Sequence, residues 1–324
     1  MNQDFPRLLG DIGGTHARWA WQPADGAALQ DVAVRRCDAH ATLAESARDY
    51  MAANGHAAPR AACIGVATPV TGDRVQMTNN RWAFSIAQLQ RELGVARCLV
   101  LNDFTALAMS LGALGPQDLR RIGGGDGQGE PAAPLALLGP GTGLGVSGLL
   151  PGPGGAWLPL AGEGGHVTLA AVDDEEAAVL DVLRQRFDHV SAERALSGPG
   201  LVHLHDALCT LAGRSAPPRT PADVVAAALD GSDTTCVQAV RLFSGFLGSV
   251  AGNLALTLGA RGGVYVGGGI VPRLGAAFDD LHFRQRFEAK GRFAAYLQPV
   301  PTWAITAATP ALLGAARALD LMPG

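Results

Sequence analysis

The stretch LLGDIGGTHARWAW, residues 8–21, joins two apolar runs through an aspartate, two glycines and a threonine. The pattern predicts a buried strand, a tight turn on bare backbone and a second strand. Glycines let backbone amides come close to an anion, and successive N–H groups form a nest for phosphate oxygens. We therefore interpret the turn as a candidate phosphate hairpin, with the Thr15 hydroxyl as a further donor. The alternative is a structural hairpin in which Asp11 caps its own turn.

A second stretch of the same kind follows later in the chain. LALLGPGTGLGVSGLL, residues 135–150, also passes from an apolar run through a glycine–threonine turn, with Thr142, to another apolar run. Two such hairpins favour phosphate binding more than either does alone. The string GLGVSG, residues 143–148, fits a dinucleotide-binding fingerprint by letter, but that fingerprint needs a helix directly after it. Prolines and glycines follow instead, so we reject that interpretation.

Lysine is nearly absent from the chain. Lys290 is the only one, and no Walker A string occurs. The charge of a polyphosphate would then be met by backbone amides, hydroxyls and a metal ion. An acid beside a phosphate cradle suits Mg²⁺, bound directly or through water. Asp11 is therefore the candidate metal ligand.

Composition points to a globular protein with two domains. The chain has 324 residues, of which 48% are hydrophobic and 17% charged, and its net charge of −4 gives no reason to expect nucleic acid or an anionic membrane as partner. The five cysteines are scattered, which predicts reduced thiols in a cytoplasmic protein. No signal peptide is expected. Residues 242–260 are uncharged, but their glycines and polar residues favour a buried helix over a membrane span.

Strand-like and helix-like segments alternate, which predicts an α/β fold. Thr42 with Glu45 three residues later forms a capping box at the start of a helix, and Thr220 followed by Pro221 marks another helix start. In the segment RCLVLNDFTALAMSLGAL we expect a strand through Leu101 and a helix from about Thr105.

Polar residues follow the strand that ends near Leu101. Asn102 and Asp103 stand where ligands usually bind in a parallel α/β sheet, at the carboxyl end of a strand. A carboxylate there can take a proton from an alcohol and make it a nucleophile. The alternative is that Asp103 only caps the next helix.

Further polar candidates lie in the second half of the chain. LPLAGEGGHV brings Glu163 and His166 within three residues of each other, between glycines that let the backbone curve. These side chains suit either acid–base chemistry or recognition of vicinal hydroxyls. Glu193, in HVSAERALSGPG, adds an acid, although such a residue is more often a solvated helix position. We interpret His203 and His205 as structural.

Taken together, these motifs resemble bacterial glucokinases of the group that lacks the zinc-binding cysteine motif of the repressor/kinase (ROK) branch. That group belongs to the hexokinase, Hsp70 and actin superfamily. The matching segments run in family order over nearly the whole chain: GDIGGTHAR, ATPVTGDRVQMTNNRWAFSI, LNDFTALAM, GTGLGV, LPLAGEGGHV, HVSAERALSGPGLV, GGVYVGGGIVPR and KGRF.

The resemblance implies a two-domain actin-like ATPase (ribonuclease H-like) fold with an interdomain cleft. The small domain would comprise residues 1–112 and 303–324, and the large domain residues 113–302. Asn79 and Trp82 would lie near the cleft. Pro140 departs from the expected pattern, in which a smaller residue stands there, and stiffens the second hairpin.

The resemblance also implies site residues. The nucleotide would be held by Gly10, Asp11, Ile12, Gly13, Gly14 and Thr15, by Gly141, Thr142 and Gly143, and by Gly267, Gly268 and Gly269 beside the adenosine. The sugar would be bound by Asn102, Asp103, Glu163, His166 and Glu193, with Asp103 as the base.

The implied activity is transfer of the γ-phosphoryl group of ATP, with Mg²⁺, to the 6-hydroxyl of glucose. A homodimer is expected from the family alone. The alternatives are a kinase for another hexose such as mannose or N-acetylglucosamine, a sugar-sensing regulator, and an actin-like filament or chaperone protein. We do not expect the regulator, because the first hairpin begins at residue 10 of this sequence, without room ahead of it for a DNA-binding helix-turn-helix, and the net charge is negative.

Overall fold

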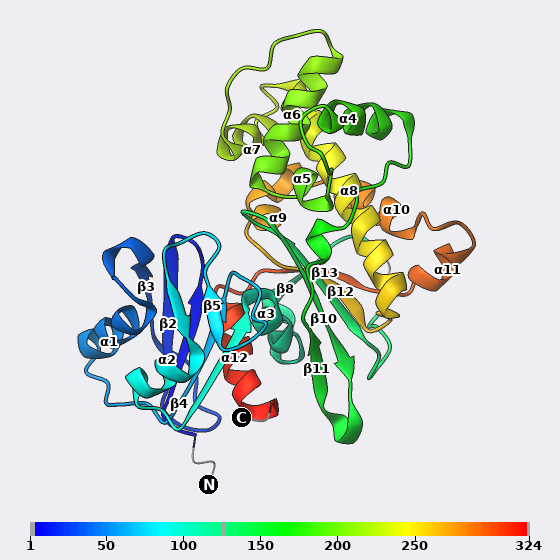
Figure 1. Ribbon diagram of the computed structural model, residues 1–324. Coiled ribbons are helices and arrows are strands. Elements are labelled where there is room, and N and C mark those ends of the chain that lie inside the picture. Colours follow the sequence, from blue (N-terminus) through cyan, green and yellow to red (C-terminus); the bar gives the residue numbers. More distant parts are fainter. Residues whose placement is uncertain (1–3, 125–126, 323–324) are drawn as a thin grey trace. The chain divides into compact units, whose positions relative to one another are not determined.

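A computed structural model describes residues 4–124 and 127–322 of the chain (Figure 1). Parts of the predicted domains, at residues 1–3, 125–126 and 323–324, lie outside the described residues. The chain divides into two compact units. Unit 1 is Met1–Leu114, Gly152–Ala161 and Ala307–Gly324, and unit 2 is Gly115–Pro151 and Gly162–Thr306.

Unit 1 is built on a five-stranded sheet in the order β3-β2-β1-β4-β7. Strands β1 and β2 form the antiparallel hairpin predicted for residues 8–21, whereas β1, β4 and β7 run parallel. The strands are β1 (Arg7–Ile12), β2 (His16–Gln22), β3 (Gln30–Arg36), β4 (Ala61–Val66) and β7 (Arg97–Asn102), and a separate two-stranded sheet holds β5 (Arg74–Gln76) and β6 (Ala83–Ser85).

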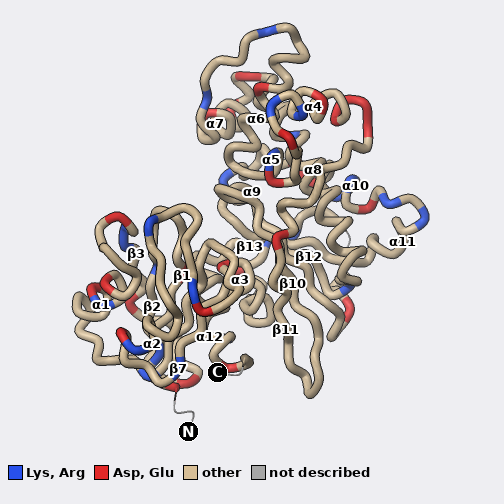
Figure 2. Tube along the Cα trace, viewed as in Figure 1, with Lys and Arg blue, Asp and Glu red and all other residues tan. Residues whose placement is uncertain are grey.

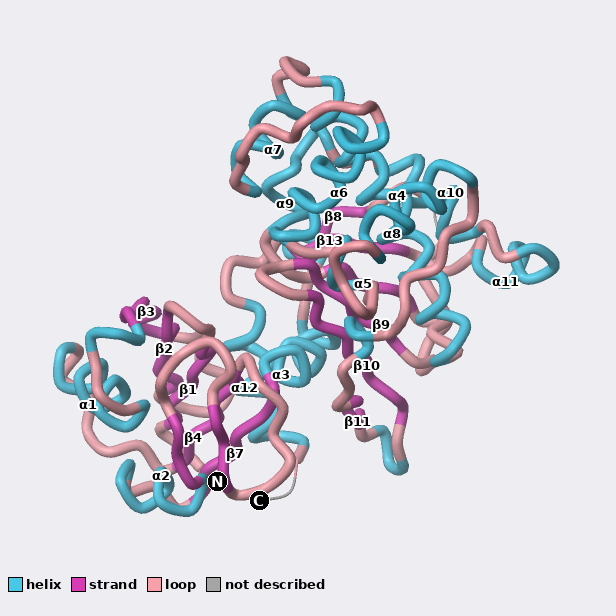
Figure 3. Tube along the Cα trace, turned by 45° about the horizontal axis from the view of Figure 1, so that its top comes forward, coloured by secondary structure: helices cyan, strands magenta, loops and turns pink. Residues whose placement is uncertain are grey.

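Helices cover both faces of the unit 1 sheet (Figure 3). Helices α1 (Leu43–Ala53) and α2 (Ile86–Leu93) share a hydrophobic core with one face. Helices α3 (Asp103–Ser110) and α12 (Pro310–Leu321) pack against each other and against β4. Strand β11 (Trp157–Leu160) contacts α3.

The last helix is tied firmly to the first strand. The guanidinium of Arg7, at the start of β1, is fully buried and donates to Asp320 Oδ1 at 2.8 Å and to the Ala316 carbonyl at 3.4 Å. Arg97 donates to the Leu319 carbonyl at 2.8 Å. Because side chains alternate along a strand, Leu9 and Asp11 lie on the same face of β1 as Arg7, the face toward α12.

Unit 2 contains the strands β10-β9-β12-β13-β8 in that order. The hairpin β9–β10 is antiparallel, and β12 runs parallel to both β9 and β13. The strands are β8 (Leu119–Arg121), β9 (Leu135–Pro140), β10 (Leu144–Pro151), β12 (Gly263–Val266) and β13 (Thr302–Ile305).

A long central helix, α8 (Thr234–Leu258), organises the helices of unit 2. It packs against β9, α6, α7 and α10, and its side chains contribute much of the core. The other helices are α4 (Asp174–Arg184), α5 (Ala192–Ala195), α6 (Gly198–Leu211), α7 (Pro221–Leu229), α9 (Ile270–Leu274), α10 (Asp280–Glu288) and α11 (Ala294–Leu297).

Several local predictions are confirmed. Thr42 and Thr220 cap α1 and α7 through their side chains, and Pro221 is the first residue of α7. The apolar residues 242–260 fall in α8, which is long and apolar enough to cross a membrane but is 72% buried in its most apolar window, as expected of a core helix. The helix expected from about Thr105 begins earlier, at Asp103, because Asn102 rather than Asp103 takes the N-cap position.

Acidic and basic residues are interspersed along both units (Figure 2). An exception is the start of α4, where Asp174, Glu175 and Glu176 occupy the first turn. Their negative charges interact favourably with the helix dipole.

Candidate active site

The first candidate phosphate turn is braced by a segment from elsewhere in unit 1. The Gly13 N–H donates to the His16 carbonyl at 2.9 Å and closes the turn, while Asn80 Nδ2 donates to the Gly13 carbonyl at 3.2 Å. A Cβ on Gly14 would lie 2.7 Å from the Cβ of Asn79, so only glycine fits there. The sequence placed Asn79 only loosely near the site, and it gave no signal for Asn80.

Asp11 has a charged neighbour that the sequence analysis missed. Arg18 stands directly opposite it in the β1–β2 hairpin, and the Arg18 guanidinium donates to Asp11 Oδ2 at 3.1 Å. Burial raises the pKa of Asp11 and the Arg18 charge opposes that rise. The sequence could have predicted Arg18 as this partner, because a four-residue turn at residues 13–16 fixes the cross-strand register.

The other residues of the first hairpin offer backbone rather than side-chain chemistry. The Ile12 side chain is fully buried in the core, and a Cβ on Gly10 would lie 2.8 Å from the ring of Trp19. Gly10 is therefore a packing glycine inside β1. Thr15 is exposed at the tip, where its hydroxyl can reach a ligand.

Asn102 and Asp103 have different structural roles at the end of β7. Asn102 Oδ1 accepts from the N–H groups of Phe104 and Thr105 at 3.0 and 3.2 Å and so caps α3. Asn102 Nδ2 donates to the Thr68 carbonyl at 3.3 Å. Asp103 is the first residue of α3, half-buried, and one of its oxygens accepts from the Phe104 N–H at 2.9 Å.

Asp11 and Asp103 lie at the same edge of one sheet. Strand register aligns Asp11 with Gly65 and Gly65 with Leu101, so both acids stand at the carboxyl ends of strands separated only by β4. The spacing between β1 and β7 is about 10 Å, twice the usual inter-strand distance. Gly65, on the strand between them, has no side chain, and a Cβ there would lie 3.5 Å from the Asp103 Cα. At this position only backbone therefore lies between the two acids.

In unit 2, the second candidate phosphate turn joins β9 to β10. The Gly141 N–H donates to the Gly143 carbonyl at 2.8 Å, and Thr142 is exposed at the tip. The Gly141 carbonyl accepts from the Gly198 N–H at 2.8 Å, at the start of α6. Pro140 ends β9 opposite Leu144.

The predicted adenosine glycines pack directly on this turn. The Gly267 N–H donates to the Leu138 carbonyl at 2.8 Å. Gly268 has a φ of +77°, and a Cβ there would lie 2.3 Å from the Pro140 carbonyl oxygen. Gly269 precedes α9. Unit 2 therefore gathers the two glycine segments that were predicted to hold opposite ends of a nucleotide.

The three sugar candidates of unit 2 are also built against β10. Glu163 directly precedes a short 3-10 helix, Gly164–His166, of which His166 is the last residue, and both residues are exposed. A Cβ on Gly165 would lie 2.0 Å from the Leu144 carbonyl oxygen, so this helix rests on the start of β10. Glu193, in α5, accepts from the Leu144 N–H at 2.9 Å.

A cavity of about 390 Å³ adjoins these residues. Its lining includes His166 and Glu193 together with Arg186, His189 and Arg194, which the sequence analysis did not single out. Such a polar, partly charged lining suits a ligand rich in hydroxyl groups.

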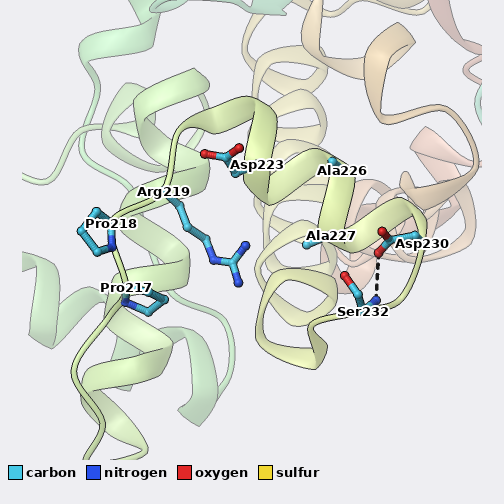
Figure 4. Close-up of a pocket in the computed structure, with 8 residues that line it drawn as sticks. All are labelled: Pro217, Pro218, Arg219, Asp223, Ala226, Ala227, Asp230 and Ser232. Atoms are coloured by element: carbon cyan, nitrogen blue, oxygen red, sulfur yellow. Dashed lines mark hydrogen bonds between the residues drawn. The ribbon is translucent and has the colours of Figure 1, made fainter.

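A second cavity, of about 320 Å³, lies between the segment before α7 and the α7–α8 turn (Figure 4). Its lining contains no residue predicted for the site. Arg219, at its edge, donates to Asp233 Oδ2 at 2.5 Å. The potential metal-binding atoms of His205, Asp233 and Cys236 lie within 4.8 Å of one another, but Asp233 Oδ1 caps α8, so we assign this carboxylate to the fold.

Proteins of one family are similar to this chain over nearly its whole length. The protein-family model for glucokinase matches residues 8–322. The glucokinase of Aromatoleum aromaticum is 58% identical over 320 residues, which cover 98% of this chain and 95% of that protein. The crystal structure of a glucokinase from an Antarctic psychrotroph, 34% identical, superposes with a TM-score of 0.88 over 97% of this chain and 98% of that one.

More distant structures share the fold. A ROK-family glucokinase from Streptomyces griseus, solved in complex with glucose and AMPPNP, is 18% identical and superposes with a TM-score of 0.63 over 96% of this chain and 98% of that one. The predicted α/β fold of the actin-like ATPase type is thereby confirmed. From its motifs, its fold and these relatives, the chain belongs to the glucokinase family.

Proposed function

We propose that this protein transfers the γ-phosphoryl group of ATP to the 6-hydroxyl of glucose, giving glucose 6-phosphate and ADP. Membership of the glucokinase family supports this activity. The observation that supports the mechanism is that Asp103 and Asp11 lie at the same edge of one sheet, on strands separated only by β4.

The nucleotide is held mainly by backbone. Both turns present N–H groups and an exposed threonine hydroxyl, Thr15 in the first and Thr142 in the second, to the phosphate oxygens. The glycines at 267–269 border the adenosine. Positioning and electrostatics therefore carry most of the catalysis, as is general in phosphoryl transfer.

The residues around the first turn also fit Mg²⁺. Asp11 offers a carboxylate at the mouth of a glycine cradle, where burial alone disfavours its charge. A dication there would relieve that penalty, and oxygen is the ligand that Mg²⁺ prefers. When bound, Mg²⁺ neutralises charge on the phosphate oxygens. Arg18 holds the Asp11 carboxylate in place through their ion pair.

Asp103 acts as the general base on the sugar. Its carboxylate accepts the proton of the 6-hydroxyl, and the oxygen attacks the γ-phosphorus in line. Asn102 fixes the start of α3 and contributes to sugar binding, and Glu163, His166 and Glu193 bind the remaining hydroxyls. Water is the competing nucleophile, so the bound sugar must be shielded from water for transfer to prevail over hydrolysis of ATP.

The test is a coupled assay for glucose 6-phosphate with ATP and Mg²⁺. Asp103→Asn is expected to lower kcat by about 10² to 10⁴ because the general base is lost, while glucose still binds by calorimetry. Asp38→Asn is a matched control, since that carboxylate is exposed and pairs with Arg36 on the surface of the same unit. Retention of a tenth of the wild-type rate by Asp103→Asn would remove the base assignment.

Three further properties complete the proposal. The scattered cysteines support the glucokinase group without the ROK zinc motif. We also propose a cytoplasmic location and a homodimer. Mannose and N-acetylglucosamine, tested beside glucose, would reveal a different preferred sugar, and sedimentation would determine the oligomeric state.

A further inference from the structure

We propose that Glu193 is a latch that couples the sugar site to the second phosphate turn, so that one carboxylate sets both glucose and nucleotide affinity. The inference rests on the proposed function, in which Glu193 binds the sugar. It adds a second task for that side chain, as a positioning residue for the nucleotide turn.

The first observation is the contact itself. Glu193 Oε2 accepts from the Leu144 N–H at 2.9 Å, at the first residue after the turn. A hydrogen bond to an ionised acceptor is stronger than a neutral one. The turn ends at a backbone amide held by a carboxylate from α5, a separate segment of unit 2.

The second observation is that the whole segment from Glu193 to Gly198 is fastened to the turn at both ends. At its far end, the Gly198 N–H donates to the Gly141 carbonyl at 2.8 Å. In between, the Ser197 hydroxyl donates to the Glu193 carbonyl at 2.8 Å and accepts from the Gly200 N–H. We therefore expect a displacement of Glu193 to shift the backbone of the turn.

The third observation explains why residue 143 is glycine. A Cβ on Gly143 would lie 2.3 Å from Glu193 Oε2 and 3.1 Å from its carboxyl carbon. The obstructing atoms are the far end of a flexible side chain, so alanine at 143 would push the carboxylate aside at little cost to the fold. By contrast, a Cβ on Gly141 meets only the Gly143 carbonyl, at 4.0 Å.

These two glycines give a matched pair of variants. Glucose affinity is measured by calorimetry without nucleotide. Gly143→Ala is expected to raise the glucose Kd by at least about tenfold, since it displaces a charged hydrogen-bonding group. Gly141→Ala, in the same turn, is expected to leave the glucose Kd within about twofold of wild type. Equal glucose affinity in the two variants would overturn the latch.

The reverse direction is tested at Glu193. Glu193→Gln keeps an oxygen that can accept from the Leu144 N–H but loses the charge, whereas Glu193→Ala loses both. With AMPPNP as the probe and no sugar present, we expect Glu193→Ala to raise the nucleotide Kd several-fold and Glu193→Gln to change it little. An unchanged Kd in Glu193→Ala would contradict the second task.

Failure of the latch differs from failure of the proposed sugar role. If Glu193→Ala binds glucose as well as wild type does, then Glu193 is not a sugar ligand and the proposed site is wrong. If Glu193→Ala loses glucose binding but Gly143→Ala does not, the proposed sugar site is retained and only the coupling to the turn is refuted. Circular dichroism melts of each variant separate these outcomes from unfolding.

Discussion

Replacing Gly314 by alanine perturbs the support of the proposed base without touching any ligand. Gly314 lies inside α12, where that helix crosses α3, the helix that Asp103 begins. A Cβ on Gly314 would lie 1.7 Å from the Ala106 carbonyl oxygen and 3.1 Å from the Ser110 nitrogen. Both obstructing atoms are backbone, so no rotamer change can make room.

The magnitude follows from these distances. Real Cβ contacts are not closer than 3.0 Å, so α3 and α12 must separate by about 1.3 Å. Overpacking of this kind costs about 1–3 kcal/mol and sometimes more, while the better helix propensity of alanine returns about 1 kcal/mol. These two contributions leave a net loss of about 1 kcal/mol, equivalent to a fall in Tm of about 2–4 °C for a unit of this size. A shift of the order of 1 Å at Asp103 would also lower kcat up to about 10²-fold.

Calorimetric unfolding and the coupled glucose 6-phosphate assay measure the two effects on the same preparation. Gly112→Ala is the control, because a Cβ there meets nothing within 4 Å. Its Tm and kcat should match those of wild type. The reasoning would be refuted by a Gly314→Ala protein whose Tm equals or exceeds that of wild type, the result that helix propensity alone predicts.

Three other predictions concern single groups. Burial raises the pKa of Asp11 above 3.8, so the folded state binds this proton more tightly than the unfolded chain does, and the resulting stabilisation is present at low pH and lost as the pH rises through the folded pKa. The Tm of Asp11→Asn should therefore increase relative to that of wild type as the pH rises toward neutrality, while Mg²⁺-dependent turnover is lost. A Tm difference that does not change with pH would contradict the raised pKa. Gly268→Ala, at a positive φ and against the Pro140 carbonyl, should raise the KM for ATP more than that for glucose, and the opposite order in steady-state kinetics would dissociate this turn from the nucleotide. Arg286→Met should lower the free energy of unfolding, measured in urea, by about 3–5 kcal/mol, because it leaves the buried Glu176 carboxylate without its partner at 2.6 Å. Adding Glu176→Gln should recover part of that stability. Without such recovery, loss of the ion pair would not explain the destabilisation.

The parts of the molecule that local chemistry dictates were predictable from sequence. The β1–β2 hairpin follows from apolar alternation around a glycine turn, and the caps at Thr42 and Thr220 follow from side-chain hydrogen bonds within a few residues. The same rules could not choose between Asn102 and Asp103 as the cap of α3, because both side chains suit that position.

Contacts between distant segments were not predictable in this way. Asn80 reaches Gly13 from 67 residues away, and Glu193 reaches Leu144 from 49 residues away. Neither pairing leaves a periodic signal, since each depends on how whole strands and helices pack. Sequence motifs singled out Glu163, His166 and Glu193, and the family resemblance implied their role in sugar binding, but their common support on β10 came only from the structure.

The attachment of α12 to β1 has a consequence for how the chain is made. Arg7 is synthesised 309 and 313 residues before its partners Ala316 and Asp320. All of unit 2 lies between these partners in the sequence, so it is synthesised before α12 can complete unit 1. Until α12 is made, α3 alone among the described helices covers that face of the unit 1 sheet, and a chain terminated near residue 309 would leave the surface that α12 buries exposed to aggregation.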